Sequence, residues 1–307
     1  MSFIGCDVAK REIAVYLDGA LSLVPNEREA LRACLKRMRI GSAVVMESTG
    51  RYHLALAREA FDLGRSVYVV NPKEFSFYRR SLEFRHTNDA SAAELLARFG
   101  EKEHDRLTTW QPPLPHIESA RALLRHRAVL VRARATIAQS LDGVSHEASE
   151  NAVQALSQAV DDADREIAEL LREEPGYTRL QSIPGVGPVT AAAMTCAFAK
   201  GAFRSADSFV AFVGLDLKFA DSGTKTGDRR LSKRGDPFLR CLLYTAACAG
   251  AHSEVWLPFY QRHLDRGLEK VQALIALARK IARTIWSMLA HQTDFQPKRA
   301  LGVDMKP

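Results

Sequence analysis

The sequence predicts an α/β domain followed by a helical remainder, and three observations lead to this prediction. Short apolar runs alternate with helical patterns over the first 72 residues. Two long helical patterns, at 117–142 and 151–172, follow a proline-containing linker, and from residue 178 the chain reads as helices with loops. Because strands that alternate with helices are typical of α/β architecture, we expect an α/β sandwich with a mixed sheet at the start of the chain.

The expected elements of this first domain begin with a short apolar run, residues 3–7, that ends in Asp7. The Asp18-Gly19 pair predicts a hairpin turn between two strands, and Asn26 is expected to cap the first helix. The expected strands are 3–7, 12–17, 20–24, 42–47 and 65–72, and the expected helices are 27–38, 53–63 and 90–99, the last stopped by Gly100.

The middle of the chain predicts a helical hairpin. Trp110 and the Gln-Pro-Pro after it read as a linker. The helix over 117–142 is rich in arginine, including Arg121, Arg125 and Arg132. Its partner over 151–172 carries a narrow apolar seam with the spacing of a coiled coil, made of Leu156, Val160, Ala163, Ile167 and Leu170. Packing and domain spacing, dimerisation and nucleic-acid binding all remain open as the role of this hairpin.

The last part of the chain predicts a helix-hairpin-helix-like element over 180–194. Gly185 and Gly187 form a Gly-x-Gly turn between two apolar helices. Such a turn points backbone N–H groups outward, which suits phosphate binding, although the same glycines can serve tight packing alone. Two more helices are expected at 237–250 and 267–289. The predicted domains are therefore 1–110, 111–176 and 177–307, in line with a chain of 307 residues.

Composition narrows the class of protein. The net charge of +7 and the pI of about 9.2 favour a polyanionic partner, most often nucleic acid. The five cysteines lack CxxC spacing, which indicates a reducing compartment and argues against a disulfide framework or structural zinc. The start of the chain lacks a signal-peptide pattern, and no apolar run is long enough for a membrane span. We therefore expect a cytoplasmic protein with no membrane partner.

The segment from 214 to 240 has the composition of a phosphate-binding loop. Ser222 lies at its mouth, beside Gly223, and further glycines let the backbone approach a partner closely. Surrounding cations can stabilise a phosphate under attack and also a serine alkoxide; a solvated basic turn is the alternative. Its cations are Lys225, Arg229, Arg230, Lys233, Arg234 and Arg240.

Three carboxylates form the second candidate site. Asp7 and Glu47 each close a predicted strand, and Asp89 precedes a helix. Mg²⁺ prefers oxygen ligands, and paired ions can activate a nucleophile and stabilise a leaving oxygen in phosphoryl transfer. A single acid at a strand end is usually only a solvated terminus, but three in one domain next to a basic domain favour a metal site.

The motifs resemble a known family. The segments FIGCDVAK, VVMESTGRY and TNDASAAELLARF, and then LQSIPGVGPVTAA, GLDLKFADSG and LSKRGDPFLRCLL, are similar to DEDD transposases of insertion sequence family 110, related to the Piv-type invertases. The resemblance covers nearly the whole chain in order. It implies a RuvC-like, ribonuclease H type N-terminal domain and a C-terminal transposase domain.

The resemblance also implies site residues. Four acids would bind Mg²⁺, and the first three correspond to Asp7, Glu47 and Asp89, whereas Ala92 occupies the position of the fourth. Alanine cannot bind a metal, so this copy is either naturally altered or engineered, and we expect impaired catalysis. Ser222 corresponds to the family's nucleophilic serine, which forms a covalent link to DNA.

The family further implies partners and assembly. A structured noncoding RNA bridges donor and target DNA, and the acids of one subunit act with the serine of another, so we expect a dimer or tetramer in the bacterial cytoplasm, associated with the nucleoid. The leading hypothesis is an RNA-guided, Mg²⁺-dependent recombinase of an insertion element. The alternatives are a catalytically inactive RNA- and DNA-binding scaffold, favoured by Ala92, and a metal-only nuclease of the RuvC type.

Overall fold

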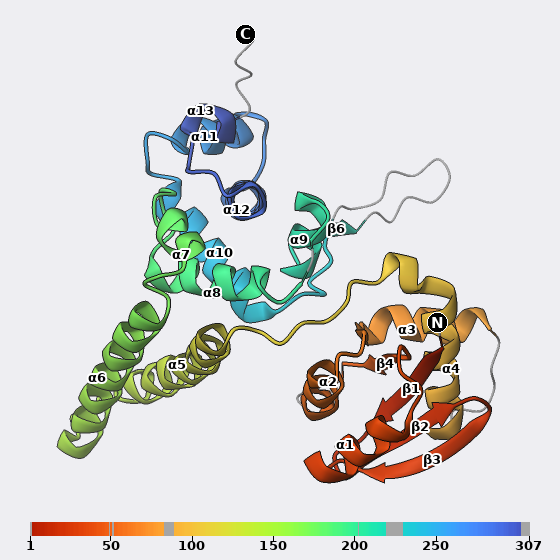
Figure 1. The fold of residues 1–307 in the computed structure, drawn as a ribbon. Helices are drawn as coiled ribbons and strands as arrows, with labels where there is room; N and C mark the ends of the chain where they lie inside the picture. The colour runs from red at the N-terminus through yellow and green to blue at the C-terminus, as the bar shows by residue number, and fades with distance from the viewer. Residues whose placement is uncertain are drawn as a thin grey trace. The chain divides into compact units, whose positions relative to one another are not determined.

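The computed structural model describes residues 2–48, 50, 52–82, 89–201, 203–218 and 230–301. The chain divides into two compact units, Met1–Pro112 and Pro113–Pro307 (Figure 1). The first unit is α/β and the second is almost entirely helical, so the predicted change from α/β to all-α along the chain is confirmed. The finer division at residue 176 stays a prediction.

A five-stranded mixed sheet forms the centre of the first unit, in the order β3-β2-β1-β4-β5. β1 pairs antiparallel with β2, which pairs antiparallel with β3, while β1, β4 and β5 run parallel. The predicted hairpin turn is confirmed, because Asp18 and Gly19 both have positive φ, at 47° and 84°. The strands are β1 (Phe3–Val8), β2 (Glu12–Leu17), β3 (Ala20–Pro25), β4 (Ala43–Glu47) and β5 (Val67–Val70).

Helices cover both faces of this sheet. On one face, α1 and α2 bury Leu31 and Leu56 against strand residues such as Ile4. On the other face, α3 and α4 bury Phe75 and Leu96 together with Phe3. These two cores make the expected α/β sandwich (Figure 1). The helices are α1 (Arg28–Arg37), α2 (His53–Asp62), α3 (Pro72–Ser81) and α4 (Asp89–Glu103).

Two predictions of helix ends were wrong because tertiary contacts decide them. Asn26 does not cap α1; its Nδ2 donates instead to the carbonyl oxygens of Ala9 and Tyr52, at 3.0 and 3.3 Å, and the position before α1 is Glu27. Gly100 does not stop α4, which continues to Glu103. A β-carbon on Gly100 would lie 2.8 Å from the Phe3 ring, so this glycine serves close helix–sheet packing.

The second unit has a helical hairpin that shares its core with the remaining helices. The apolar seam predicted on α6 is confirmed, since Val160, Ala163 and Ile167 are buried, and Figure 1 shows α5 and α6 side by side. At the base of the hairpin, Ile117 of α5 belongs to the same core as Ile281 of α12. The helices are α5 (Pro115–Ser140), α6 (Glu147–Leu170), α7 (Pro175–Leu180), α8 (Pro188–Phe198), α9 (Ala206–Phe212), α10 (Pro237–Gly250), α11 (Leu257–Asp265), α12 (Lys270–His291) and α13 (Pro297–Leu301).

Two short strands complete this unit: β6 (Leu217–Lys218) pairs antiparallel with β7 (Arg230–Leu231). In the part of the chain that the structure describes, no helix combines the length and the apolar character that a membrane crossing requires.

Candidate active site and nucleic-acid interface

Asp7 and Glu47 lie side by side at one end of the sheet. β1 and β4 are parallel, with Cys6 opposite Met46, so the next residue on each strand is a half-buried carboxylate. Burial raises the pKa of Glu47, the charge of Asp7 raises it further, and Arg79 of α3 opposes this rise. The structure therefore brings together two of the predicted acids, as the strand ends suggested.

Helix α4 directs its first turn toward the same end of the sheet. A β-carbon on Gly5 would lie 1.8 Å from the carbonyl oxygen of Ala93, so α4 rests directly on β1 at a position that only glycine allows. Gly100, further along α4, lies against Phe3. The helix thus runs antiparallel to β1, and its start approaches the Asp7 end of the strand.

The third predicted acid, Asp89, is the first residue of α4, and its side chain lies outside the described residues. Ala92 is only 8% exposed and lies three residues later, on the same helix face. Among the residues described, no group of three or more acidic, histidine or cysteine side chains is gathered as a metal site. The Asp7 and Glu47 pair nevertheless fits a divalent cation, because carboxylate oxygens suit such ions and two adjacent negative charges favour one.

The stem of the predicted serine loop is a small hairpin. Leu217 pairs with Leu231, and just beyond this pair the Ser232 N–H donates to the Asp216 carbonyl at 2.8 Å. The Ser232 hydroxyl, 7% exposed as a residue, donates to the Asp216 carboxylate and accepts from the N–H of Arg234 at 3.3 Å. Sequence reasoning missed this pair; the available signal was an acid and a hydroxyl flanking the glycine-rich loop on opposite sides.

The loop itself lies largely outside the described residues. This holds for Ser222, Lys225 and Arg229, and for the side chain of Arg230. Of the other predicted cations in this segment, Lys233 and Arg234 are exposed. Arg240 is half-buried, and its Nη1 donates to the Gly235 carbonyl at 3.4 Å.

The predicted helix-hairpin-helix-like turn lies between α7 and α8. Gly185 has φ +91°, and a β-carbon there would lie 2.2 Å from the carbonyl oxygen of Ala246 on α10, so packing alone requires this glycine. The buried Trp256 holds the turn by donating its Nε1–H to the Pro184 carbonyl at 3.0 Å. Gly187 precedes α8, is exposed and has open space beside it. Its predicted phosphate contact stays a prediction.

The arginines of α5 have different environments. Arg127 donates to both carboxylate oxygens of Asp164 on α6 and so clamps the hairpin together. Arg125 and Arg132 are exposed, and Arg121 is half-buried.

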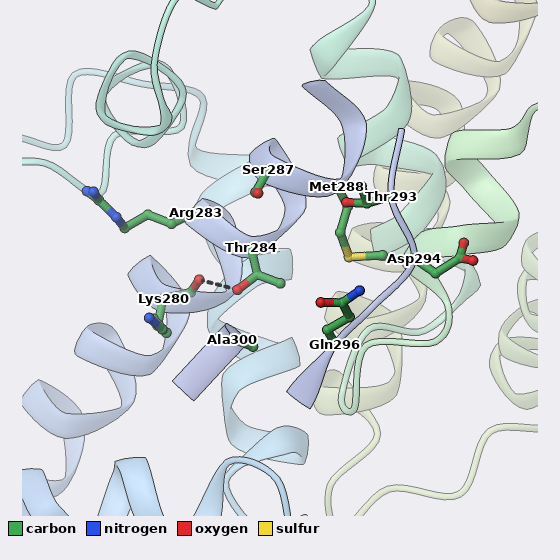
Figure 2. Close-up of a pocket in the computed structure, with 9 residues that line it drawn as sticks. All are labelled: Lys280, Arg283, Thr284, Ser287, Met288, Thr293, Asp294, Gln296 and Ala300. Carbon is green, nitrogen blue, oxygen red and sulfur yellow. Dashed lines mark hydrogen bonds between the residues drawn. The ribbon is translucent and has the colours of Figure 1, made fainter. Parts of the chain in front are cut away.

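A small pocket lies elsewhere in this unit, between α12 and the segment that follows it (Figure 2). Its volume is about 160 Å³. Two of its charged groups are paired with other elements, since Arg283 is bonded to Asp207 and Asp294 lies 3.4 Å from Arg179. It contains none of the predicted site residues.

Comparison with known proteins identifies relatives for both units. Residues 4–147 match a DEDD model of the IS110 type, described as "Transposase", and residues 177–261 match the "Transposase IS116/IS110/IS902 family". The chain is similar to the "Pilin gene-inverting protein" of Moraxella bovis, at 27% identity over 83% of this chain and 82% of the relative. It is similar to the "Probable family 20 transposase" of Pseudomonas aeruginosa, at 25% identity over 97% and 99%. It is also similar to the "Transposase for insertion sequence element IS1111A" of Coxiella burnetii, at 30% identity over 45% and 40%.

Proposed function

Because this chain belongs to the IS116/IS110/IS902 family of transposases, which are DNA-cleaving and strand-exchanging enzymes, we propose that its two units supply different parts of one recombination reaction. The resemblance that the motifs indicated is thereby confirmed. The observation that supports the proposal best is the convergence of Asp7, Glu47 and the first turn of α4 at one end of the sheet.

The first unit would provide the metal-binding acids, on a RuvC-like, ribonuclease H type fold. DEDD transposases are generally dependent on a divalent metal, and we assign Mg²⁺ because Asp7, Glu47 and Asp89 would offer only oxygen ligands. When bound, such an ion lowers the charge barrier to attack on a phosphate. Asp7 and Glu47 would hold it beside the scissile phosphate, and the short, buried strands keep both carboxylates in place.

The second unit would provide the nucleophile. The Ser222 hydroxyl attacks the DNA phosphorus, so a serine O–P bond forms while the P–O bond to the leaving deoxyribose breaks, and the hydroxyl proton ends on the leaving oxygen or in solvent. A second deoxyribose hydroxyl then attacks the phosphoserine and regenerates the serine. The Asp216–Ser232 stem holds both ends of this loop.

Nucleic-acid binding would involve the basic residues of the second unit. We propose that donor and target DNA, and a bridging noncoding RNA, contact the Gly185/Gly187 turn and the cations of α5 and of the loop. A homo-oligomer would then join the two halves of each site, in the bacterial cytoplasm and in association with the nucleoid. The contact residues proposed are Gly185, Gly187, Arg121, Arg125, Arg132, Lys225, Arg229, Arg230, Lys233, Arg234 and Arg240.

Ala92 favours a second candidate function, an inactive nucleic-acid-binding scaffold. Its buried methyl group lies where the family places a fourth acid. The protein with alanine at this position would therefore bind nucleic acid but cleave it poorly. Loss of a ligand from a metal site removes several kcal/mol of transition-state stabilisation, and about 1.4 kcal/mol is already tenfold in rate.

The test is a covalent-adduct assay with labelled DNA, guide RNA and Mg²⁺, resolved on a denaturing gel. Ala92→Asp should increase the protein–DNA adduct at least about tenfold, and Ser222→Ala in the Ala92→Asp protein should abolish it. Equal adduct from the parent and Ala92→Asp would show that the fourth acid is dispensable. Recombination without Ser222 would favour a nucleophile elsewhere, and cleavage without any adduct would favour the metal-only nuclease.

A further inference from the structure

A cation that sequence reasoning did not single out, Lys200, lies with two arginines of α5. Helices α5 and α8 touch where the Cys196 thiol donates to the Ile117 carbonyl at 3.9 Å. Arg121 follows Ile117 by one helical turn, and Lys200 follows Cys196 by four residues. Arg125 lies one turn further along the same face of α5. We call Arg121, Arg125 and Lys200 the α5–α8 cation cluster.

The members of this cluster act on one another electrostatically. Lys200 is exposed, and partial desolvation by its surroundings lowers its pKa; the charge of Arg121 lowers this pKa further, with a smaller contribution from Arg125. Burial likewise lowers the pKa of Arg121, and Arg125 adds to that effect. The three cations are opposed by Asp236, near Lys200, and by Glu118, near Arg121. The fold therefore gathers three like charges on one surface, with Arg121 half-buried and Arg125 and Lys200 exposed, and their mutual repulsion favours binding of an anion there.

The contrast with Arg127 shows that this surface is not ordinary hairpin packing. Arg127 lies on the same helix, and both oxygens of Asp164 neutralise it across the hairpin. The α5–α8 cluster has no such clamp across to α6, and Arg125 is exposed. Arg127 thus stabilises the hairpin, whereas Arg121 and Arg125 are not engaged by α6 and can contact a ligand.

Asp236 connects this cluster to the basic end of the serine loop. Its Oδ1 accepts from the Phe238 N–H at 2.8 Å and caps α10, and its negative charge opposes the lowering of the Lys200 pKa. Lys233 and Arg234, both exposed, lie three and two residues before it in the chain. The segment that leads from the serine loop into α10 therefore comes near Lys200.

We propose that Arg121, Arg125 and Lys200 form a single binding site for the phosphodiester backbone of a nucleic acid strand that leads to the Ser222 loop. The inference rests on the proposed function, because it needs a nucleic-acid substrate. Guanidinium groups match phosphate oxygens with two parallel hydrogen bonds, and partial desolvation strengthens each contact. A bound phosphate also relieves the repulsion among the three cations.

Affinity and stability should respond in opposite directions, which separates a ligand site from a structural one. Lys200→Gln and Arg121→Gln each remove one charge from a repelling cluster, so the melting temperature should stay the same or rise. Affinity for nucleic acid should fall about tenfold, and the slope of log Kd against log salt should decrease by about 1.

The experiment measures fluorescence anisotropy of the full chain with a labelled DNA duplex and, separately, with a labelled RNA hairpin, at several salt concentrations. Arg165→Gln is the matched control, because Arg165 is an exposed arginine of α6 already paired with Asp162, and it should change neither quantity. If the variants lose affinity for the DNA duplex, the strand bound at this site is DNA; if they lose affinity for the RNA hairpin, it is RNA.

If the parent binds and the Lys200→Gln and Arg121→Gln variants keep its affinity and salt slope with both probes, the proposed binding site is wrong. The proposed function would not be affected by that result. A fall in melting temperature that accompanies the loss of affinity would assign the cluster to folding and would also overturn it. A parent chain that binds neither probe would overturn both proposals together.

Discussion

At the scale of single residues, Glu59 shows how the first unit holds α1 and α2 together. Its side chain is 4% exposed and accepts from Arg28 at 2.5 Å and from Arg32 at 3.0 Å. Burial alone would raise the pKa of Glu59, but the hydrogen bonds from Arg28 and Arg32 outweigh it, and the net shift is downward. A carboxylate whose pKa is lower in the folded state than in the unfolded state stabilises the fold at pH values above its unfolded-state pKa. That contribution is lost as the pH falls through the folded-state pKa.

Glu59→Gln should therefore lower the free energy of unfolding by about 1–3 kcal/mol at neutral pH, through loss of two charge-assisted hydrogen bonds. The difference from the parent should persist down to the ordinary glutamate value of 4.5 and shrink below it. Chemical denaturation over a series of pH values measures this, with the exposed Glu74→Gln as control. A difference that grows on acidification would contradict the assignment.

At the scale of helices and strands, the sequence pattern predicted those features that depend on residues close together in the chain. The strands that end at or one residue after Glu47 and Asp7, and the hairpin turn at Asp18-Gly19, follow from alternation and turn chemistry within a few residues. Asn26 and Gly100 were misread because their partners, Ala9 and Phe3, are remote in sequence. Short helices such as α9 and α11 were missed for the same reason, since few of their own residues carry the periodicity.

The candidate site shows the same division. The positions of Asp7 and Glu47 could be predicted from strand ends, because parallel strands end together. The position of Lys200 could not, because it depends on a contact between segments that no local pattern pairs; for the Asp216–Ser232 pair the sequence offered only an acid and a hydroxyl on either side of the loop. The family resemblance supplied the role of Ser222, which the residues themselves left open between a reactive loop and a solvated turn.

The Asp216–Ser232 pair leads to a prediction about the serine loop. Ser232→Ala in the Ala92→Asp background should reduce the initial rate of adduct formation about tenfold at saturating DNA, because one hydrogen bond at the loop's base, about 1 kcal/mol, is lost together with its effect on loop position. Affinity for DNA should stay within about twofold, since the variant keeps every cation.

Two further variants test whether this is positioning and not stability. Ser232→Thr retains the hydroxyl and should restore the rate. Ser208→Ala removes a serine hydroxyl that accepts from the Ser205 N–H and donates to the Ser205 carbonyl, at the start of α9, and should lower the melting temperature without slowing adduct formation. Equal rates for Ser232→Ala and its parent would exclude the stem from catalysis.

At the scale of the whole molecule, the proposed reaction divides its chemistry between the two units. The carboxylates belong to Met1–Pro112 and Ser222 belongs to Pro113–Pro307. The net charge of +7 is consistent with a polyanionic partner. A reaction that needs both units can be assembled within one chain or between two, and these arrangements differ in how mixed variants behave.

We predict sites shared between subunits. In the Ala92→Asp background, an equimolar mixture of Asp7→Ala and Ser222→Ala proteins should recover about a quarter of parental recombination, because half of randomly formed dimers are mixed and each mixed dimer has one intact shared site. Each variant alone should be inactive. If each site were built within one chain, the mixture would stay inactive even when co-purification shows that the variants assemble.

The reciprocal mixture, parent with the Asp7→Ala/Ser222→Ala double variant, tests the same point independently. Shared sites leave about a quarter of the sites active, whereas sites within one chain leave about half.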